Sequence, residues 1–496
     1  MVDDGIEDEQ RQALNFLLPL LELPLQEVWT RYFAMGGDSG LLEVEAFLHD
    51  LVPLPDLQRD VLAQTVNERL DELAWPGRVP LSRTVRDTRP SDGPLAALVE
   101  LLDGAHLAAP ERLGDVAERA ASCLGLGLVT YLVDYEQQHL HPLPSPAARG
   151  RTSLSVDGTL AGRAFQTVRA QESENVDGAR LWVPLVDGVE RLGVLEVSVP
   201  RATDLHDPGL HTQCRWLSRM IGHLLTSMSA YGDALDALRR TRQRDLATEL
   251  LTSLLPPRTT GVDGFVLSAS LQPSYQAAGD AFDYALTAEG ASLAVFDAMG
   301  HDVNAGIVAA ASVAAYRRAR RAGGGVYAQA RAVDELLATT FPDAFCTGVL
   351  AELDLPSGRL RYLSAGHPSP LLYRRGKVVR SLDLGRRVPF GLDDPEVTVG
   401  EEYLQPGDWL MLYTDGVTEA RDGAGQLFGE ARLADFLARE ASTGYPPPET
   451  VRRLMQAVLA HQQGVLQDDA TVLLASWRHE QPGVWRDEPR DEDVLL

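Results

Sequence analysis

Apolar residues recur at helical spacing through the first part of the chain. They form three groups, Leu14 with Leu17 and Leu18, Val44 with Phe47 and Leu48, and Val61 with Leu62, Val66 and Leu70. Side chains three and four positions apart lie on one face of a helix, so this spacing predicts a small helical region. Residues 76–94 are rich in Pro, Gly, Ser and Arg, which predicts a linker. We therefore place a helical region and its linker at 1–90.

The segment 95–230 alternates helical and strand-like patterns. A helix is predicted over about 95–124, and a strand follows at Gly127–Val133. The apolar runs at 180–184 and 192–199 flank the turn-forming VDGVE, which predicts a hairpin of two strands. The alternation predicts a separate α/β domain.

A helix is expected to begin near residue 208 and to continue into a coiled coil. Its apolar residues fall at alternating steps of four and three, the spacing of a coiled-coil seam: Leu217, Ile221, Leu224, Met228, Tyr231, Leu235 and Leu238. The pattern breaks where Arg242 and Asp245 take seam positions. We predict a signalling helix over 217–255 that forms a parallel homodimer. A helix that packs on its own domain is the alternative.

Residues 256–478 are rich in strand-like patterns. Two long helices are predicted within this part, near 303–321 and 326–340. The final stretch, 479–496, is charged and acidic, which predicts a disordered tail. The predicted fold class of the whole chain is α+β.

Composition narrows the range of partners. The chain has 45 basic and 71 acidic residues and a net charge of −26, which argues against binding to nucleic acid or an anionic membrane.

Its three cysteines are far apart, as in a protein with reduced thiols. The N-terminus has no signal-peptide pattern, and the longest run of small apolar residues, 305–316, is too short to span a bilayer. We expect a soluble cytoplasmic protein.

Aspartates stand at the ends of apolar strands in the C-terminal part. Asp297 ends the run SLAVFD, Asp415 ends WLMLYTD, Asp280 lies in AAGDAFDY, and the pair Asp468-Asp469 opens the last strand. Any one of them alone is most simply a turn or capping residue. Together they predict a cluster of carboxylates, which repel one another unless divalent cations lie between them.

Hard oxygen ligands suit Mg²⁺ or Mn²⁺. Two such ions can bridge a water molecule, lower its pKa and hold a phosphoryl group for in-line attack. The sequence has no Cys, Ser or His nucleophile motif, which fits water as the attacking group. It has no GxxxxGK[ST] phosphate loop, so an NTPase of that class is not expected.

Six ordered motifs resemble the metal-dependent protein phosphatases of the protein phosphatase 2C type, and most of all their bacterial SpoIIE-like branch. They are AGDAFDY (278–284), FDAMGHDVNAG (296–306), LSAGHPSPLLY (363–373), LYTDGVTEARD (412–422), FGEARL (428–433) and QDDATVLL (467–474). The resemblance covers about 245–477. It implies an αββα sandwich, two antiparallel sheets flanked by helix pairs. It also implies hydrolysis of phosphoserine or phosphothreonine on proteins with two Mn²⁺ or Mg²⁺ ions.

The resemblance assigns the metal-binding and catalytic aspartates position by position. They are Asp280, Asp297, Asp415 and Asp468. The residue after the second of these often is glycine in the family and lends its backbone carbonyl to a metal. Here it is Ala298, and since a carbonyl does not depend on the side chain, this departure changes little.

Other residues are expected to lie next to these ligands and hold them in place without binding the metal themselves. Asp283 lies three residues after Asp280, so in a regular strand it points to the other face. Gly416 and Asp469 flank two of the predicted ligands. Asp469 occupies a position where relatives have Asn or Asp.

The sequence leaves two candidates for the group that protonates the leaving oxygen. Eukaryotic relatives place a histidine where this chain has Met299, and nearby His301 or water could protonate the leaving oxygen. A plain loop histidine is the alternative for His301. His367 in AGHP is expected to shape a turn, and the basic run at 317–321 is most simply a solvated helix face.

The phrases GTLAGRAF (158–165) and RLWVPLVDGVERLGVLEVSV (180–199) resemble a GAF domain, a small-molecule sensor fold. The resemblance covers most of 95–230 and implies a possible small-molecule ligand. A ligand-free dimerisation domain is the alternative.

The sequence therefore indicates a sensor-regulated protein serine/threonine phosphatase. The branch implies a phosphorylated anti-sigma-factor antagonist as substrate and release of a sigma factor by partner switching. An inactive scaffold with the phosphatase fold and a phosphatase of small phosphoesters or nucleotides are the alternatives. Presence of all four aspartates argues against the scaffold.

Overall fold

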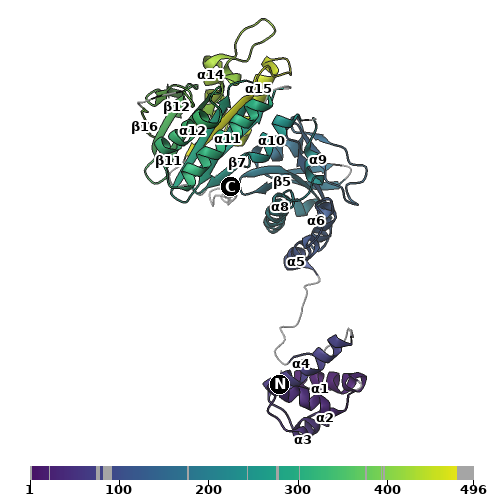
Figure 1. Ribbon diagram of the computed structural model, residues 1–496. Coiled ribbons are helices and arrows are strands. Elements are labelled where there is room, and N and C mark those ends of the chain that lie inside the picture. The colour runs from purple at the N-terminus through teal and green to yellow at the C-terminus, as the bar shows by residue number, and fades with distance from the viewer. Residues whose placement is uncertain are drawn as a thin grey trace. The chain divides into compact units, whose positions relative to one another are not determined.

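The computed structural model describes residues 3–21, 23–73, 79–81, 92–175, 178–242, 244–274, 279–300, 302–374, 377–392, 394 and 397–477. The chain divides into two compact units, Met1–Pro90 and Ser91–Leu496 (Figure 1). Most of the linker predicted at 76–94 and the whole tail predicted at 479–496 lie outside the described residues.

The first unit is helical, as predicted. Its elements are α1 (Asp3–Leu17), the 3-10 turn η1 (Leu18–Leu21), α2 (Leu25–Ala34), α3 (Leu41–Leu48) and α4 (Asp56–Glu72). Their apolar residues meet in one core, which includes Leu14, Val44, Phe47, Leu62 and Val66. The helical spacing in the sequence therefore marks the buried faces of real helices.

The second unit begins with a six-stranded sheet in the order β3-β2-β1-β6-β5-β4. Its strands are β1 (Gly127–Val133), β2 (His139–Pro142), β3 (Leu154–Ser155), β4 (Gln171–Asn175), β5 (Gly178–Asp187) and β6 (Glu190–Val199). The predicted hairpin is confirmed, because β5 and β6 pair antiparallel with Pro184 opposite Val194. Helix α7 (Leu160–Thr167) packs on the face that carries Val129 and Val194.

The other face of this sheet is covered by helices that differ from the prediction. The single helix expected over 95–124 is wrong, since α5 (Gly93–Ala105) ends before the short turn η2 (Pro110–Arg112) and α6 (Leu113–Ser122) follows. Pro110 lacks the N–H that a continuous helix needs. A further short turn, η3 (Ala202–His206), leads into the next helix.

The continuous coiled-coil helix predicted over 217–255 is also wrong. Three helices replace it: α8 (Pro208–Met228), α9 (Ala234–Arg239) and α10 (Leu246–Leu254). Seam residues such as Leu217, Ile221 and Met228 are buried in the core of the first sheet. A seven-residue apolar repeat marks a buried helix face, and here that face packs on its own sheet. The homodimer stays a prediction.

The rest of the second unit is a sandwich of two six-stranded sheets. One sheet has the order β15-β12-β11-β10-β9 with β16 beside β12, and the other has the order β14-β13-β17-β18-β8-β7. The strands of the first are β9 (Asp280–Leu286), β10 (Gly290–Ala298), β11 (Cys346–Asp354), β12 (Arg359–Ala365), β15 (Arg386–Arg387) and β16 (Gly400–Tyr403). Those of the second are β7 (Thr259–Val262), β8 (Phe265–Gln272), β13 (Leu371–Arg374), β14 (Lys377–Ser381), β17 (Trp409–Tyr413) and β18 (Ala470–Trp477).

Helix layers cover both outer faces of the sandwich. Helices α11 (Val303–Arg321) and α12 (Val326–Thr340) pack on β9–β12, at the bounds that the sequence predicts. On the other side lie α13 (Asp415–Thr418), α14 (Gly429–Ala441) and α15 (Pro447–His461). A third apolar cluster, with Leu293, Leu353 and Leu473, fills the space between the sheets. The predicted α+β class and αββα layering are confirmed.

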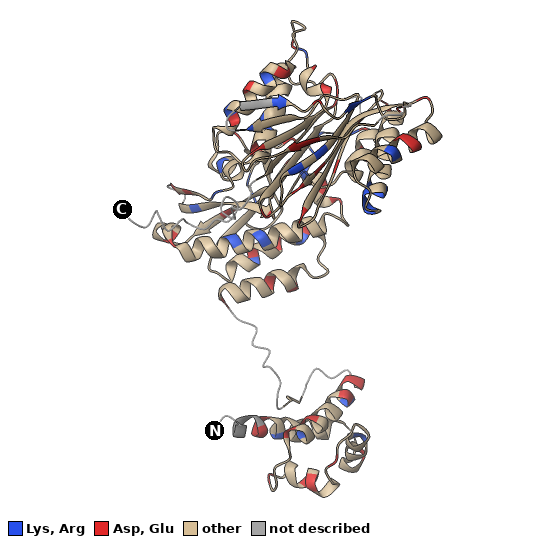
Figure 2. Ribbon diagram, turned by 90° about the vertical axis from the view of Figure 1, so that its left-hand side faces the viewer, with Lys and Arg blue, Asp and Glu red and all other residues tan. Residues whose placement is uncertain are grey.

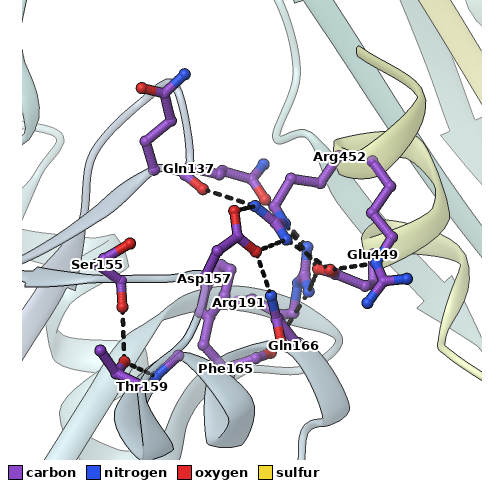
Figure 3. A network of polar contacts seen from close by, with 12 residues as sticks. Gln137, Ser155, Asp157, Thr159, Phe165, Gln166, Arg191, Glu449 and Arg452 are labelled. Atoms are coloured by element: carbon purple, nitrogen blue, oxygen red, sulfur yellow. Dashed lines mark hydrogen bonds and ion pairs between the residues drawn. The ribbon is translucent and has the colours of Figure 1, made fainter. Parts of the chain in front are cut away.

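A buried ionic network joins the first sheet to the sandwich (Figure 3). Arg191 of β6 donates to Glu449 of α15, and Glu449 also accepts from Arg452 on the same helix. Arg452 reaches back to Asp157, which precedes α7, with Nη2–Oδ1 at 2.8 Å. Because a charge buried in this way needs its partner, the network fixes how α15 lies against the first sheet.

Acidic and basic residues are interspersed over the helices and strands of the larger unit (Figure 2). Within the described part of the chain, no helix combines the length and apolar character needed to cross a membrane.

Candidate functional site

Asp280 and Asp297 lie opposite each other on neighbouring strands at one end of a sheet. Asp280 begins β9 and Asp297 is the last residue but one of β10, and their Cα atoms are register partners. Alternation along β10 places Asp297 on the same face as Leu293 and Val295, which fill the space between the two sheets. Residues directly opposite on antiparallel strands have Cβ atoms roughly 4.5–5.5 Å apart. Two carboxylates therefore share one end of the sandwich interior.

Asp280 is buried and held by a threonine from the other sheet. Thr414 Oγ1 donates to Asp280 Oδ2 at 2.8 Å, and the same hydroxyl accepts from the backbone N–H of Thr471 at 2.9 Å. Burial raises the pKa of Asp280 well above its ordinary value, and the nearby charges of Asp297 and Asp469 raise it further. The Asp280 side chain is thus fixed in position. No basic side chain among the described residues compensates its negative charge.

Asp297 is electrostatically the centre of the group. Burial raises its pKa to about 7, with further contributions from Asp415 and Asp468. Thr347 Oγ1 donates to Asp297 Oδ2 at 3.4 Å. The next residue, Ala298, is buried, and its N–H donates to Gly279 O at 3.0 Å. Four strand ends therefore bring their acidic residues into mutual electrostatic range.

Asp415 and Asp468 come from the second sheet. Asp415 follows β17 as the first residue of α13, and burial and the charge of Asp468 raise its pKa. Asp468 is exposed, and it immediately precedes Asp469, which leads into β18. Gly416 packs so closely that a Cβ there would lie 1.8 Å from the Asp469 carbonyl oxygen. Only glycine fits this contact between α13 and the chain entering β18.

Asp469 organises the backbone before β9. Its Oδ1 accepts from the N–H of Ser274 and its Oδ2 from the N–H of Gly279, both at 2.8 Å. These bonds tie the chain entering β18 to the residues that precede Asp280. Burial nevertheless raises the pKa of Asp469, against the effect of the backbone hydrogen bonds.

Asp283 points away from the group, on the helix-covered face of the sheet. It forms ion pairs with Arg317 and Arg320 of α11, with N–O distances of 2.6 and 2.7 Å. The alternation argument for Asp283 is therefore confirmed for the direction of its side chain. The interpretation of 317–321 as merely a solvated face is wrong for these two arginines, because Asp283 is buried and takes both as counterions.

His301 lies outside the described residues, so its proposed part in proton transfer stays a prediction. His367 is buried and does not face solvent. Its Nδ1 lies 2.8 Å from Thr347 Oγ1, and its carbonyl accepts from Ser364 Oγ at 2.8 Å.

Sequence reasoning missed Thr347 and Thr414 as supports of the aspartates. Thr414, which directly precedes Asp415, could have been found in the Thr-Asp-Gly motif, whereas nothing in the sequence marks Thr347.

The donor set fits divalent cations by its chemistry. It consists of carboxylate oxygens with a backbone carbonyl beside them, the ligand type that Mg²⁺ and Mn²⁺ take. Burial, followed by repulsion from neighbouring aspartates, raises the pKa values of Asp280, Asp297 and Asp415, and a cation among them would offset both effects. Among the described residues no group of three or more His, Cys, Asp or Glu side chains is arranged so that it could hold a metal ion as it stands.

Residues 287–478 match the family model described as Stage II sporulation protein E (SpoIIE). Protein IcfG of Synechocystis sp. is 30% identical over 152 residues, 30% of this chain and 23% of that protein. Stage II sporulation protein E of Priestia megaterium is 23% identical over 195 residues, 38% of this chain and 32% of that protein. The chain spans about a quarter to a third of the length of these curated relatives.

Solved structures resemble the same part. The RsbU and RsbW domains of Rv1364c from Mycobacterium tuberculosis give a TM-score of 0.39 at 29% identity, covering 44% of this chain and 63% of that one. The SiaA-PP2C domain of Pseudomonas aeruginosa gives 0.38 at 25% identity, covering 43% and 85%. Residues 287–478 thus match the SpoIIE family model, as the sequence motifs indicated. The GAF resemblance of the first sheet stays a prediction.

Proposed function

We propose that the SpoIIE-family segment is a metal-dependent protein serine/threonine phosphatase. One observation carries the proposal most strongly: aspartates from the ends of both sheets converge, and burial together with mutual repulsion raises the pKa of Asp297 to about 7. A purely structural role gives no reason to gather buried negative charges in this way, because each one opposes folding unless it is compensated. Phosphate ester hydrolysis by divalent cations gives such a reason.

The cations would be Mn²⁺ or Mg²⁺, held by Asp280, Asp297, Asp415 and Asp468 with the carbonyl of Ala298. Bound there, they would supply Lewis-acid chemistry, lowering the pKa of water and neutralising charge on a phosphoryl group. The exposed position of Asp468 leaves one side of the group open to solvent and substrate.

The protein's own residues hold the ligands in place. Thr414 donates to Asp280, and Thr347 donates to Asp297, so one oxygen of each carboxylate is oriented by a hydroxyl. Asp469 fixes the backbone ahead of Asp280 through Ser274 and Gly279. This support reduces the rearrangement that the carboxylates need when they bind a cation.

The substrate class follows from the family. We propose phosphoserine or phosphothreonine on a protein, and specifically an anti-sigma-factor antagonist in a partner-switching pathway. The sheet over 127–199 would act as the GAF-like sensor, and the ionic network around Glu449 supports mechanical contact between it and the phosphatase segment.

Hydrolysis of p-nitrophenyl phosphate tests the mechanism. The full-length wild type is assayed with Mn²⁺, with Mg²⁺ and with EDTA, beside Asp297→Asn and the control Asp435→Asn, whose side chain is exposed on α14. We expect metal-dependent activity in the wild type and control, and loss of at least a hundredfold in Asp297→Asn. Equal activity in EDTA, or in Asp297→Asn, would contradict the proposal.

The substrate class is tested separately. A phosphoserine protein, a phosphoserine peptide and free nucleotides are compared at equal concentration by phosphate release. Preference for the phosphoprotein supports the proposal, and preference for nucleotides would favour a small-phosphoester phosphatase instead.

A further inference from the structure

A cavity of about 630 Å³ lies where the first sheet, helices α8–α10 and the phosphatase sandwich meet. This volume falls within the range of small-molecule sites, roughly 300–1,000 Å³. Five arginines line it, in a chain whose net charge is −26: Arg239, Arg240, Arg242, Arg244 and Arg258. Their concentration at one place suggests a negatively charged occupant.

Three of these arginines surround one aromatic ring. The guanidinium carbons of Arg239, Arg244 and Arg258 lie 4.7, 4.5 and 5.6 Å from the centre of Tyr135. Burial lowers the pKa of Arg258, and the like charges of Arg239 and Arg244 lower it further. Cations held this close repel one another, so an anion bound among them would be favoured.

Two acids near the cavity pair with one of its arginines, and two others accept hydrogen bonds from neutral donors. Glu249 and Asp236 both pair with Arg240, at 2.9 and 2.7 Å. Glu136 accepts from Thr241, and Asp245 caps α10 by accepting from the N–H of Thr248.

Glu190 is different. It lines the cavity, and its Oε2 is buried without a hydrogen-bond partner among the described residues. A buried acceptor left without a partner is unfavourable, so an occupant with a hydroxyl or N–H donor would fit beside it. Arg239 and Arg258 both interact with Glu190, which places this acceptor next to the cationic group.

Another part of the wall is apolar. It includes Leu192 and Leu225 from the first sheet and α8, and Leu255 and Phe282 from the phosphatase side. The cavity therefore offers cations, one acceptor and an apolar surface within one volume.

We propose that this cavity binds an organic phosphate of nucleotide size. Its phosphate lies against the arginines around Tyr135, its donor group faces Glu190, and its apolar body lies on the leucines and Phe282. Guanidinium groups bind phosphate through paired N–H donors, which is stronger than binding to a single point charge.

The occupant would touch both halves of the larger unit. Ser274 lines the cavity, and its N–H donates to Asp469 Oδ1 at 2.8 Å. Asp469 in turn holds the backbone before Asp280. Any effect of the occupant on catalysis rests on the proposed phosphatase function, but its binding does not.

Binding is tested on the full-length protein in EDTA, so that the aspartate group binds no metal and attracts no phosphate. The probes are pyrophosphate, which reports the cationic part alone, and the fluorescent nucleotide N-methylanthraniloyl-ADP, which also has an apolar body. The test variants are Arg244→Gln, which removes one cation beside Tyr135, and Ala230→Trp, which adds bulk at the exposed rim of the cavity and leaves every arginine in the chain. Arg201→Gln, an exposed arginine outside the cavity, is the control.

We expect saturable binding of both probes, tighter for the nucleotide, and displacement of the nucleotide by pyrophosphate but not by sodium chloride of equal ionic strength. Both test variants should weaken binding at least tenfold while Arg201→Gln leaves it unchanged. Absence of binding to the wild type, or equal binding by the wild type and both test variants, would overturn the proposal. Circular dichroism establishes that each variant is folded.

Discussion

Arg191 and Glu449 form an ion pair across 258 positions of the chain, with Nη1–Oε2 at 2.9 Å and both side chains almost fully buried. Arg191 belongs to the first sheet and Glu449 to a helix of the phosphatase sandwich. Burial acts to raise the pKa of Glu449, but Arg452 and Arg191 outweigh it and hold that pKa below its ordinary value. The carboxylate therefore remains charged. It is the common partner of Arg191 from the first sheet and Arg452 from α15.

We predict that Glu449→Gln destabilises the larger unit by about 3–5 kcal/mol, the usual effect of breaking a buried ion pair, because Arg191 and Arg452 then lack their shared counterion. Chemical denaturation followed by tryptophan fluorescence measures the change. The control is Glu111→Gln on the short turn η2, where the side chain is exposed. A change below about 1 kcal/mol, the range of exposed pairs, would contradict the buried network.

Replacing Asp469 by Asn should loosen the segment that leads into Asp280. An amide has one acceptor oxygen, so it can serve Ser274 or Gly279 but presents N–H groups to the other donor. We expect a loss of stability of about 1–3 kcal/mol, typical for one unsatisfied buried donor. We also expect a higher metal concentration for half-maximal hydrolysis of p-nitrophenyl phosphate. Unchanged metal dependence in a folded variant would show that Asp469 does not support the aspartate group.

Gly416→Ala is predicted to be far more harmful than its size suggests. The new methyl carbon would lie 1.8 Å from the Asp469 carbonyl oxygen, which is backbone and cannot turn aside. Either α13, which begins with Asp415, or the chain entering β18, which includes Asp468, must shift. Gly127→Ala is the matched control, since its Cβ would meet only the Ser198 side chain, with Cβ at 3.4 Å and Oγ at 3.8 Å. We expect loss of soluble protein or of activity in the first variant alone, measured by yield, melting temperature and hydrolysis rate.

His367 makes stability depend on pH. Burial lowers its pKa from 6.5 to about 4, so between these values the unfolded chain binds a proton that the folded chain does not. The contribution of His367 to the free energy of unfolding is therefore complete above pH 6.5 and is lost as the pH falls towards 4. The total loss is about 3 kcal/mol. His367→Asn can keep the contact to Thr347 and does not titrate.

Urea denaturation of both proteins at several pH values between 4.5 and 7.5 measures this effect. The wild type should lose more stability than His367→Asn as the pH falls. Parallel curves for the two proteins would mean that another group causes the acid sensitivity.

Local patterns in the sequence suffice for much of the architecture. The apolar run over Gly127–Val133, the hairpin around residue 188 and the helices at 303–321 and 326–340 all follow from periodicity and turn residues, because these signals depend on near neighbours. The coiled-coil prediction fails for a physical reason. Leu217, Ile221 and Met228 define a helix face to be buried, but the sequence does not say whether a second chain or the chain's own sheet buries it.

The same division holds for the candidate site. The sequence by itself determines which strands end in aspartate, and alternation determines that Asp280 and Asp283 face opposite sides of β9. Only the tertiary structure decides that Thr347 orients Asp297 and that Thr414 orients Asp280. It also decides that Asp469 bonds the backbone before Asp280, and that Arg317 and Arg320 neutralise Asp283. These contacts join residues tens to hundreds of positions apart, so they exist only once the two sheets and their helices have packed together.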